Sequence, residues 1–228
     1  MNNQSTIARW KIEEVLNAVT HGIGTVLAVI ALLVMLWLYN DGGMWHVVSC
    51  AIYGGSLVLL YLASTLYHSF TNEKLKLLFK FFDHAAIYIL IAGNYTPFAL
   101  IPLHGSFGWT IFSVIWIMAA TGIIFQIFCV QKFRIFATIC YLVMGWFAVV
   151  MIQPLMETLP IEAIYWLLVG GIFYTVGAVF YLVKKIPYNH AIWHLFVLAG
   201  SAAHFVAIAC FVLPMPIVME RFSALLML

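Results

Sequence analysis

The feature that most constrains the fold is a series of seven apolar runs, each about as long as a membrane-crossing helix. A helix needs about 20 mostly apolar residues to cross a hydrocarbon layer about 30 Å thick. Only 8% of the 228 residues are charged, whereas a water-soluble surface carries roughly a quarter of its residues as charges. The sequence therefore predicts an all-α bundle of seven transmembrane helices. The predicted spans are 19–39, 45–67, 84–103, 107–129, 135–155, 162–183 and 191–213.

The connections between these runs are short, so a single membrane domain over residues 1–228 is expected. The longest connection is predicted over residues 69–82. The first 18 residues are too polar for the apolar core of a signal peptide, and the first span is therefore expected to be retained. We expect no nucleic-acid partner, and the sequence leaves the oligomeric state open.

The basic residues predict the orientation of the bundle, because Lys and Arg accumulate in the cytoplasmic connections of membrane proteins. Nine of the ten fall in the N-terminal segment or in every second connection: Arg9, Lys11, Lys74, Lys76, Lys80, Lys132, Arg134, Lys184 and Lys185. The opposite side has Arg221 with Asp41, Glu157, Glu162 and Glu220. Such a split requires an odd number of spans. It predicts a cytoplasmic N-terminus and an external C-terminus.

Four potential metal-site residues fall at one depth in this topology: His68, Asp83, His190 and His194. Ionisable side chains inside a membrane are costly and usually have a partner. His190 and His194 are separated by one helical turn, which puts both imidazoles on one face of a helix. With His68 they predict a zinc site, and three imidazoles leave the fourth tetrahedral position open to water, as in catalytic zinc sites.

Asp83 is suited to act on that water. A carboxylate beside the open position can orient the water and act as general base during attack on a carbonyl. Ser64 lies one turn before His68 on the same helix face. Its hydroxyl could contact the water or a developing oxyanion, or could instead bond a backbone carbonyl.

The remaining polar residues have simpler interpretations. Glu14, Asn17, Thr20 and His21 form a polar stripe at the start of the first span, which predicts either a network beside the metal site or helix capping. His46, His84, His104 and His204 are interpreted as hydrogen-bonded or interfacial histidines. The four cysteines, Cys50, Cys129, Cys140 and Cys210, are interpreted as buried apolar residues.

Several stretches, taken in order, resemble the hemolysin III proteins, which are the bacterial branch of the progestin and adipoQ receptor family. They are Glu14-Val-Leu-Asn17-Ala-Val-Thr20-His21, Ser64-Thr-Leu-Tyr-His68, Phe82-Asp83-His84, Ala92-Gly93-Asn94-Tyr95-Thr96-Pro97-Phe98 and Pro187-Tyr188-Asn189-His190-Ala-Ile-Trp-His194. The resemblance implies seven helices in the bacterial inner membrane and zinc on His68, His190 and His194. It also implies that Asp83 contacts a zinc-bound water. Asn94 departs from the family's pattern, which has Thr or Ser there.

Three functional hypotheses follow. The leading one is a zinc-dependent hydrolase of lipid amides or esters, an activity that alkaline ceramidases in the same superfamily suggest, with membrane lipids as substrates and a role in lipid homeostasis. The second is a non-enzymatic membrane sensor, receptor or homeostasis factor in which zinc is structural. The third is a pore-forming cytolysin, which is disfavoured because the spans are apolar on all sides.

Overall fold

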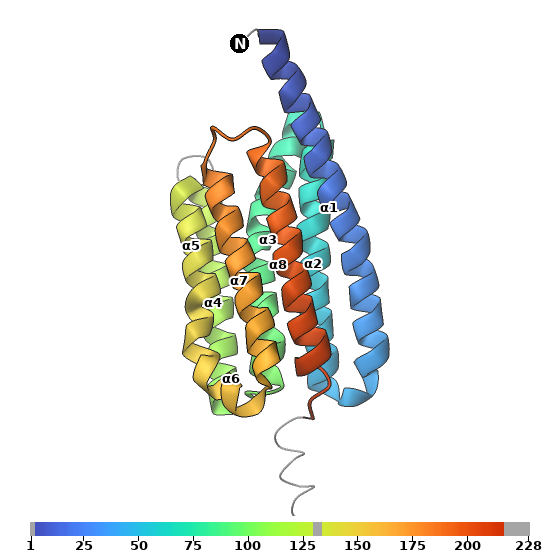
Figure 1. Cartoon of the computed structure of the whole chain (residues 1–228), viewed down its shortest axis with the longest axis vertical. Helices are drawn as coiled ribbons and strands as arrows, with labels where there is room; N and C mark the ends of the chain where they lie inside the picture. The colour runs from blue at the N-terminus through green and yellow to red at the C-terminus, as the bar shows by residue number, and fades with distance from the viewer. Residues whose placement is uncertain (1–2, 130–133, 217–228) are drawn as a thin grey trace, which may run out of the picture.

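The computed structural model describes residues 3–129 and 134–216, and all regular structure in these ranges is helical (Figure 1). The long helices alternate in direction and pack side by side as one bundle. The helices are α1 (Asn3–Tyr39), α2 (Met44–Ser69), α3 (Glu73–Leu100), α4 (Ser106–Cys129), α5 (Arg134–Trp146), α6 (Ile152–Thr158), α7 (Ile161–Leu182) and α8 (Asn189–Ala207). Two 3-10 segments, Asn40–Gly42 and Phe147–Met151, and a π-helical end, Ile208–Val212, complete them. The predicted all-α class is confirmed for the described residues.

Six helical segments in the described ranges are long and apolar enough to cross a membrane. They correspond to six of the seven predicted spans. The remaining helix, α3, is less apolar because it carries Asp83, His84, Asn94 and Thr96. Its C-terminal third, residues 92–100, is entirely buried in the bundle. The seventh crossing and the orientation of the termini stay predictions.

In two places the helices differ in extent or regularity from the predicted spans. Residues 69–82 are mostly helical, because the side chain of Asn72 accepts hydrogen bonds from the backbone N–H groups of Lys74 and Leu75 and so starts α3 at Glu73. The predicted span 135–155 is interrupted after Trp146 by a 3-10 segment. Pro154, in the following helix α6, has no N–H to donate and its ring crowds the preceding turn, which favours the 3-10 geometry of the residues before it.

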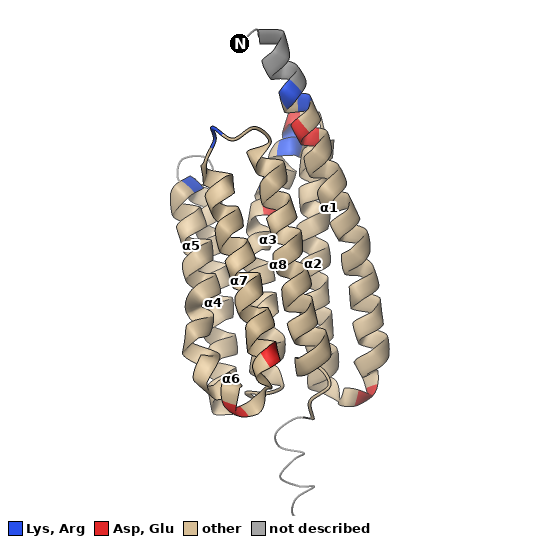
Figure 2. Ribbon diagram, viewed as in Figure 1, with Lys and Arg blue, Asp and Glu red and all other residues tan. Residues whose placement is uncertain are grey.

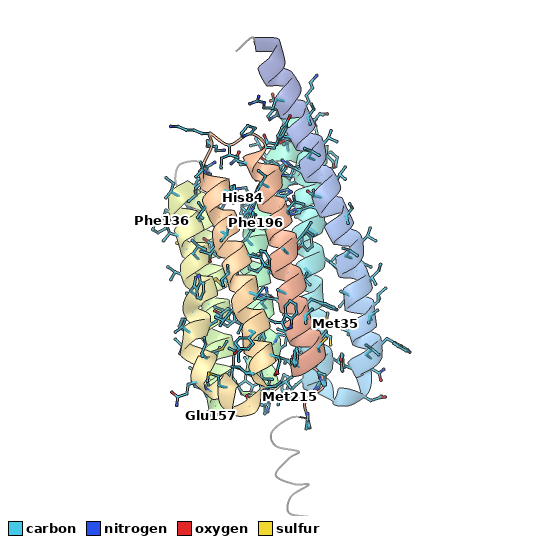
Figure 3. The ribbon with its side chains drawn as sticks, viewed as in Figure 1. Met35, His84, Phe136, Glu157, Phe196 and Met215 are labelled. Atoms are coloured by element: carbon cyan, nitrogen blue, oxygen red, sulfur yellow. The ribbon has the colours of Figure 1, made fainter. Side chains whose placement is uncertain are left out.

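The bundle has an apolar exterior and a partly polar interior. Trp37 and Phe128 are 75% and 80% exposed, and Phe136 on α5 also points away from the bundle (Figure 3). Each such residue favours lipid over water as its surroundings. Asn17 and His21, by contrast, are 1% and 3% exposed. An exterior of this kind is what a multi-pass membrane protein requires.

A single face of α1 packs against the bundle through Asn17, His21, Gly24, Ala28 and Met35, which recur at helical spacing. Gly24 permits the closest approach. A Cβ atom there would lie 2.7 Å from the Tyr61 ring on α2 and 2.9 Å from the Leu198 side chain on α8. The absence of a side chain at Gly24 therefore lets α1 sit in the groove between α2 and α8.

Basic side chains gather at one end of the bundle, where some acidic ones also lie, and among the described residues the charged ones at the other end are all acidic (Figure 2). The described Lys and Arg residues gather at the end where α1 begins, whereas Asp41, Glu157 and Glu162 lie at the other end. This is the distribution that the sequence predicts. Lys132, Glu220 and Arg221 lie outside the described residues.

Candidate metal centre

His68, His190 and His194 meet at the basic end of the bundle. Their candidate ligand atoms all lie within 4.8 Å of one another, and the His190 and His194 ring centroids are 4.7 Å apart. Ligand nitrogens of one zinc ion, each about 2.0–2.1 Å from the metal, are about 3.4 Å apart. Small side-chain rotations would therefore bring the three nitrogens into coordination. The sequence prediction that α2 and α8 bring these three residues together is confirmed.

The donor atoms themselves suit a metal ion. The Nε2 atoms of His68 and His190 are buried and have no hydrogen-bond partner in the described part of the chain. A buried polar atom without a partner costs free energy that a bound cation would offset. Three imidazoles also match the nitrogen donors that zinc prefers. The residues therefore fit a metal ion, and its identity as zinc is part of the proposal below.

Two contacts fix His190 at the start of α8. The side-chain amide of Asn189 donates to the backbone carbonyls of Phe180 and Tyr181 at 3.2 and 3.1 Å, which ties α8 to the end of α7. The backbone N–H of His190 donates to a carboxylate oxygen of Glu13 at 3.1 Å. Glu13 thus caps α8 from α1, a contact favoured by the helix dipole.

His68 is oriented by Glu14. Its Nδ1 atom lies 3.3 Å from a carboxylate oxygen of Glu14, and the other oxygen of that carboxylate pairs with Lys76. When His68 Nδ1–H donates to Glu14, Nε2 is left as the free acceptor that a metal needs. Glu14 therefore belongs to the network beside the metal site, one of its two predicted interpretations.

His194 is oriented by the same helix. Its Nδ1 atom lies 3.3 Å from the backbone carbonyl of Asn17 and 3.3 Å from the hydroxyl of Thr20. Donation from Nδ1–H to the carbonyl directs Nε2 toward the other histidines. The His21 ring stacks on His194, with ring centroids 3.5 Å apart and planes only 6° from parallel. The polar stripe of α1 therefore holds the ligands without being among them.

Sequence reasoning missed Glu13. The sequence places Glu13 and Glu14 next to each other where α1 enters the bundle, and only Glu14 falls on the predicted polar stripe. Because Glu13 contacts a backbone N–H instead of a side chain, the residue types in the sequence do not indicate its partner. The available signal in the sequence was the adjacent pair Glu13 and Glu14, just before the apolar run of the first span.

Asp83 and Ser64 lie near the histidines in different settings. Asp83 is 8% exposed and lines one cavity together with His190 and His194, and its carboxylate lies 3.3 Å from Nδ1 of His84. Ser64 is fully buried, and its hydroxyl has no hydrogen-bond partner among the described residues. The backbone-carbonyl bond weighed for Ser64 is thus not formed. The catalytic roles of both residues stay predictions.

Two cavities meet at the histidines. An apolar cavity of about 150 Å³ extends into the bundle from Asp83 and His194 to Phe98 and His204. A second cavity, of about 300 Å³, lies at the basic end, and its lining is more polar than that of the first, with charged and aromatic side chains together. The residues that line both are His84, Thr138, Tyr141, Tyr181 and His190. The candidate metal centre therefore lies where a polar and an apolar compartment join.

Four further histidines form hydrogen bonds, as predicted. His46 contacts the backbone carbonyl of Met215 at 2.8 Å, and His104 that of Leu100 at 3.0 Å. His84 contacts the carbonyl of Lys80 at 2.8 Å and lies inside the bundle (Figure 3). His204 contacts the Leu167 carbonyl at 3.1 Å and Asn94 at 3.2 Å. None of these four belongs to the three-histidine cluster.

Comparison with known proteins gives concordant matches over most of the chain. Residues 9–205 match the family described as Haemolysin-III related. The chain is 51% identical to Hemolysin-3 of Bacillus cereus over 203 residues, which cover 89% of this chain and 93% of that protein. It is 47% identical to the Hemolysin-3 homolog of Bacillus subtilis (strain 168), with 90% and 96% covered. It is also 32% identical to the human monocyte to macrophage differentiation factor, with 86% and 83% covered.

Proposed function

This chain belongs to the Haemolysin-III related family and is a multi-pass protein of the plasma membrane, and we propose that it is a zinc-dependent hydrolase of amide or ester bonds in membrane lipids. The observation that carries this proposal is the position of the three-histidine cluster. It lies at the junction of a polar and an apolar cavity, with the Asp83 carboxylate lining the apolar one. A lipid has the same division, with an acyl chain on one side of its amide or ester bond and a head group on the other.

The roles of the residues follow from that division. A zinc ion held by His68, His190 and His194 would supply Lewis-acid polarisation of the acyl carbonyl and activation of water. Asp83 accepts a proton from the attacking water as the water oxygen bonds to the acyl carbon. The carbon–nitrogen or carbon–oxygen bond then breaks, and the proton passes to the leaving amine or alkoxide. The products are a fatty acid and an amine or alcohol, so all atoms and charges balance.

The decisive experiment measures turnover. Purified protein in lipid nanodiscs is incubated with a panel of ceramides and acyl lipids, and released fatty acid is quantified by mass spectrometry. Asp83→Ala should lower the rate about 10²–10⁴-fold, the usual contribution of a general base, while elemental analysis still finds one metal ion per chain. His194→Ala should lose both activity and metal. His104→Ala, at the far end of the bundle, is the matched histidine control and should retain both.

Absence of turnover over the whole panel by metal-loaded protein would refute the hydrolase.

A structural role for the metal is the second candidate, because His68 lies on α2 whereas His190 and His194 lie on α8. An ion shared by these helices would join two elements far apart in sequence and contribute directly to folding. In that case Asp83→Ala would leave the cellular phenotype intact in a stable, metal-loaded protein. Loss of the phenotype in such a protein would exclude this candidate.

The cytolysin hypothesis draws only on the names of the Bacillus relatives. It predicts that purified protein lyses lipid vesicles and that His194→Ala lyses them equally. Vesicles that stay intact would exclude it.

A further inference from the structure

We propose that the polar cavity binds the phosphate of an anionic lipid head group while the acyl chain occupies the apolar cavity. The inference rests on the proposed function, since it names the class of lipid that the hydrolase would accept. It concerns residues outside the metal centre: Lys80 on α3, Arg134 at the start of α5 and Lys184 after α7.

These three cations come from different elements and line one cavity. In the described part of the chain no carboxylate lies within ion-pair distance of any of them. The Glu14 carboxylate in the same cavity is already paired with Lys76. Glu13 caps α8 and keeps its negative charge, so three cations face one carboxylate that has no Lys or Arg partner among the described residues. The cavity therefore carries an excess of positive charge, and an anion entering it would meet cations whose charge is not yet balanced.

Arg134 is already oriented toward this position. Its Nη2 group donates to the backbone carbonyl of Leu182 at 3.3 Å, and its guanidinium lies over the Tyr181 ring, 4.8 Å from the ring centroid. Tyr181 lines both cavities. Two weak contacts therefore hold the guanidinium near the junction, and its remaining N–H groups are suited to the oxygen atoms of a phosphate.

A buried amide adds a neutral donor to the same cavity. Gln126 on α4 is 2% exposed and lines the polar cavity. A side-chain amide has two N–H groups that can donate hydrogen bonds to phosphate oxygens. The polar cavity thus combines charged and neutral donors from α3, α4 and α5, whereas the apolar cavity beyond His190 presents Phe98 and Met151.

The general preference of basic residues for the cytoplasmic side does not account for this arrangement. That preference requires only that Lys and Arg lie at one end of the bundle. Lys185 satisfies it, being exposed and absent from the lining of both cavities. Its neighbour Lys184 lines the polar cavity. A comparison of substitutions at these two adjacent lysines therefore distinguishes the contribution of the cavity from the contribution of overall charge.

The test measures binding, so it does not depend on turnover. Full-length protein in phosphatidylcholine nanodiscs is titrated by calorimetry with three probes: dihexanoyl phosphatidic acid, neutral dihexanoylglycerol and inorganic phosphate. Each titration is done with metal-loaded and with chelator-treated protein, because phosphate could otherwise bind the metal itself. The variants are Lys80→Gln, Arg134→Gln and Lys184→Gln, with Lys185→Gln as the matched control.

The anionic lipid should bind at least about tenfold more tightly than the neutral lipid, with or without metal, because its phosphate adds charge-assisted hydrogen bonds. Each cavity variant should weaken that binding about threefold or more, the size expected for one partly exposed charge contact, and Lys185→Gln should leave it unchanged. Lys184 is exposed, so Lys184→Gln should fold normally. This variant therefore still tests the inference if Arg134→Gln misfolds.

Equal affinity for the anionic and neutral lipids would overturn the inference, as would equal losses in Lys184→Gln and Lys185→Gln. Inorganic phosphate binding as tightly as phosphatidic acid would show that the ligand is a free anion, which also overturns the lipid assignment. Selective binding without hydrolysis would refute the proposed enzyme and leave the head-group site intact. Lipid hydrolysis without selective binding of the anionic lipid would support the proposed enzyme and refute the head-group site.

Discussion

Glu14→Gln tests whether the first helix controls the metal site without supplying a ligand. In the structure the Glu14 carboxylate accepts from His68 Nδ1 at 3.3 Å and also pairs with Lys76. Glutamine has nearly the same shape, and its amide oxygen can still accept a hydrogen bond. The substitution therefore removes the negative charge while keeping the geometry, which isolates the electrostatic part of the interaction.

The expected loss can be bounded. Removing a carboxylate that orients a metal-binding histidine typically costs 10–100-fold in metal affinity, or about 1.4–2.7 kcal/mol. Because the amide retains an acceptor, we expect the lower part of this range, about 10–30-fold. The measurement is a zinc titration of purified protein against a competing chelator of known affinity.

The control is Glu73→Gln, which removes the same charge from an exposed position at the start of α3, at the same end of the bundle. It should change zinc affinity less than about twofold, because an exposed charge away from the site is largely screened. Zinc binding by Glu14→Gln that is as tight as in the parent protein would refute the argument. So would an equal loss in both variants.

Two further predictions concern stability. Chelation should lower the melting temperature of the parent protein by about 5–10 °C when the ion was present at about 100 times its Kd. His194→Ala should melt at the same temperature with and without chelator. A parent protein whose melting temperature does not respond to the chelator would contradict metal binding. Gly24→Ala should destabilise the bundle by about 1–3 kcal/mol, because its Cβ would overlap Tyr61 and Leu198. Gly55→Ala, with open space around its Cβ, should be neutral or stabilising in the same melt, and equal losses in both would show that packing at Gly24 is not tight.

The three-histidine cluster could be predicted from the sequence because it depends on two robust patterns. His190 and His194 are one turn apart, which fixes their shared face once α8 is a helix. Alternation of apolar runs then brings the end of α2, and with it His68, to the same end of the bundle. Neither step needs the rotation of any helix about its axis.

The individual contacts that support the three histidines depend on those rotations and could not be predicted, although the polar stripe on α1 could. Glu14 reaches His68, and Glu13 reaches the N-terminus of α8, because α1 sits in the groove that Gly24 makes available. The two cavities are likewise the spaces left between packed helices. The 3-10 segment before Pro154 is a local effect that a proline favours, whereas the apolar run around it extends uniformly and predicts one continuous span.

The neighbouring acids Glu13 and Glu14 give the first crossing an influence beyond its own composition. One secures the segment that bears two of the clustered imidazole rings, and the other secures the third ring. A chain trimmed of this crossing would keep all three imidazoles and still lose the means of aligning them. Any force that slid the first crossing along its axis, such as a change in bilayer thickness, would disturb both attachments together.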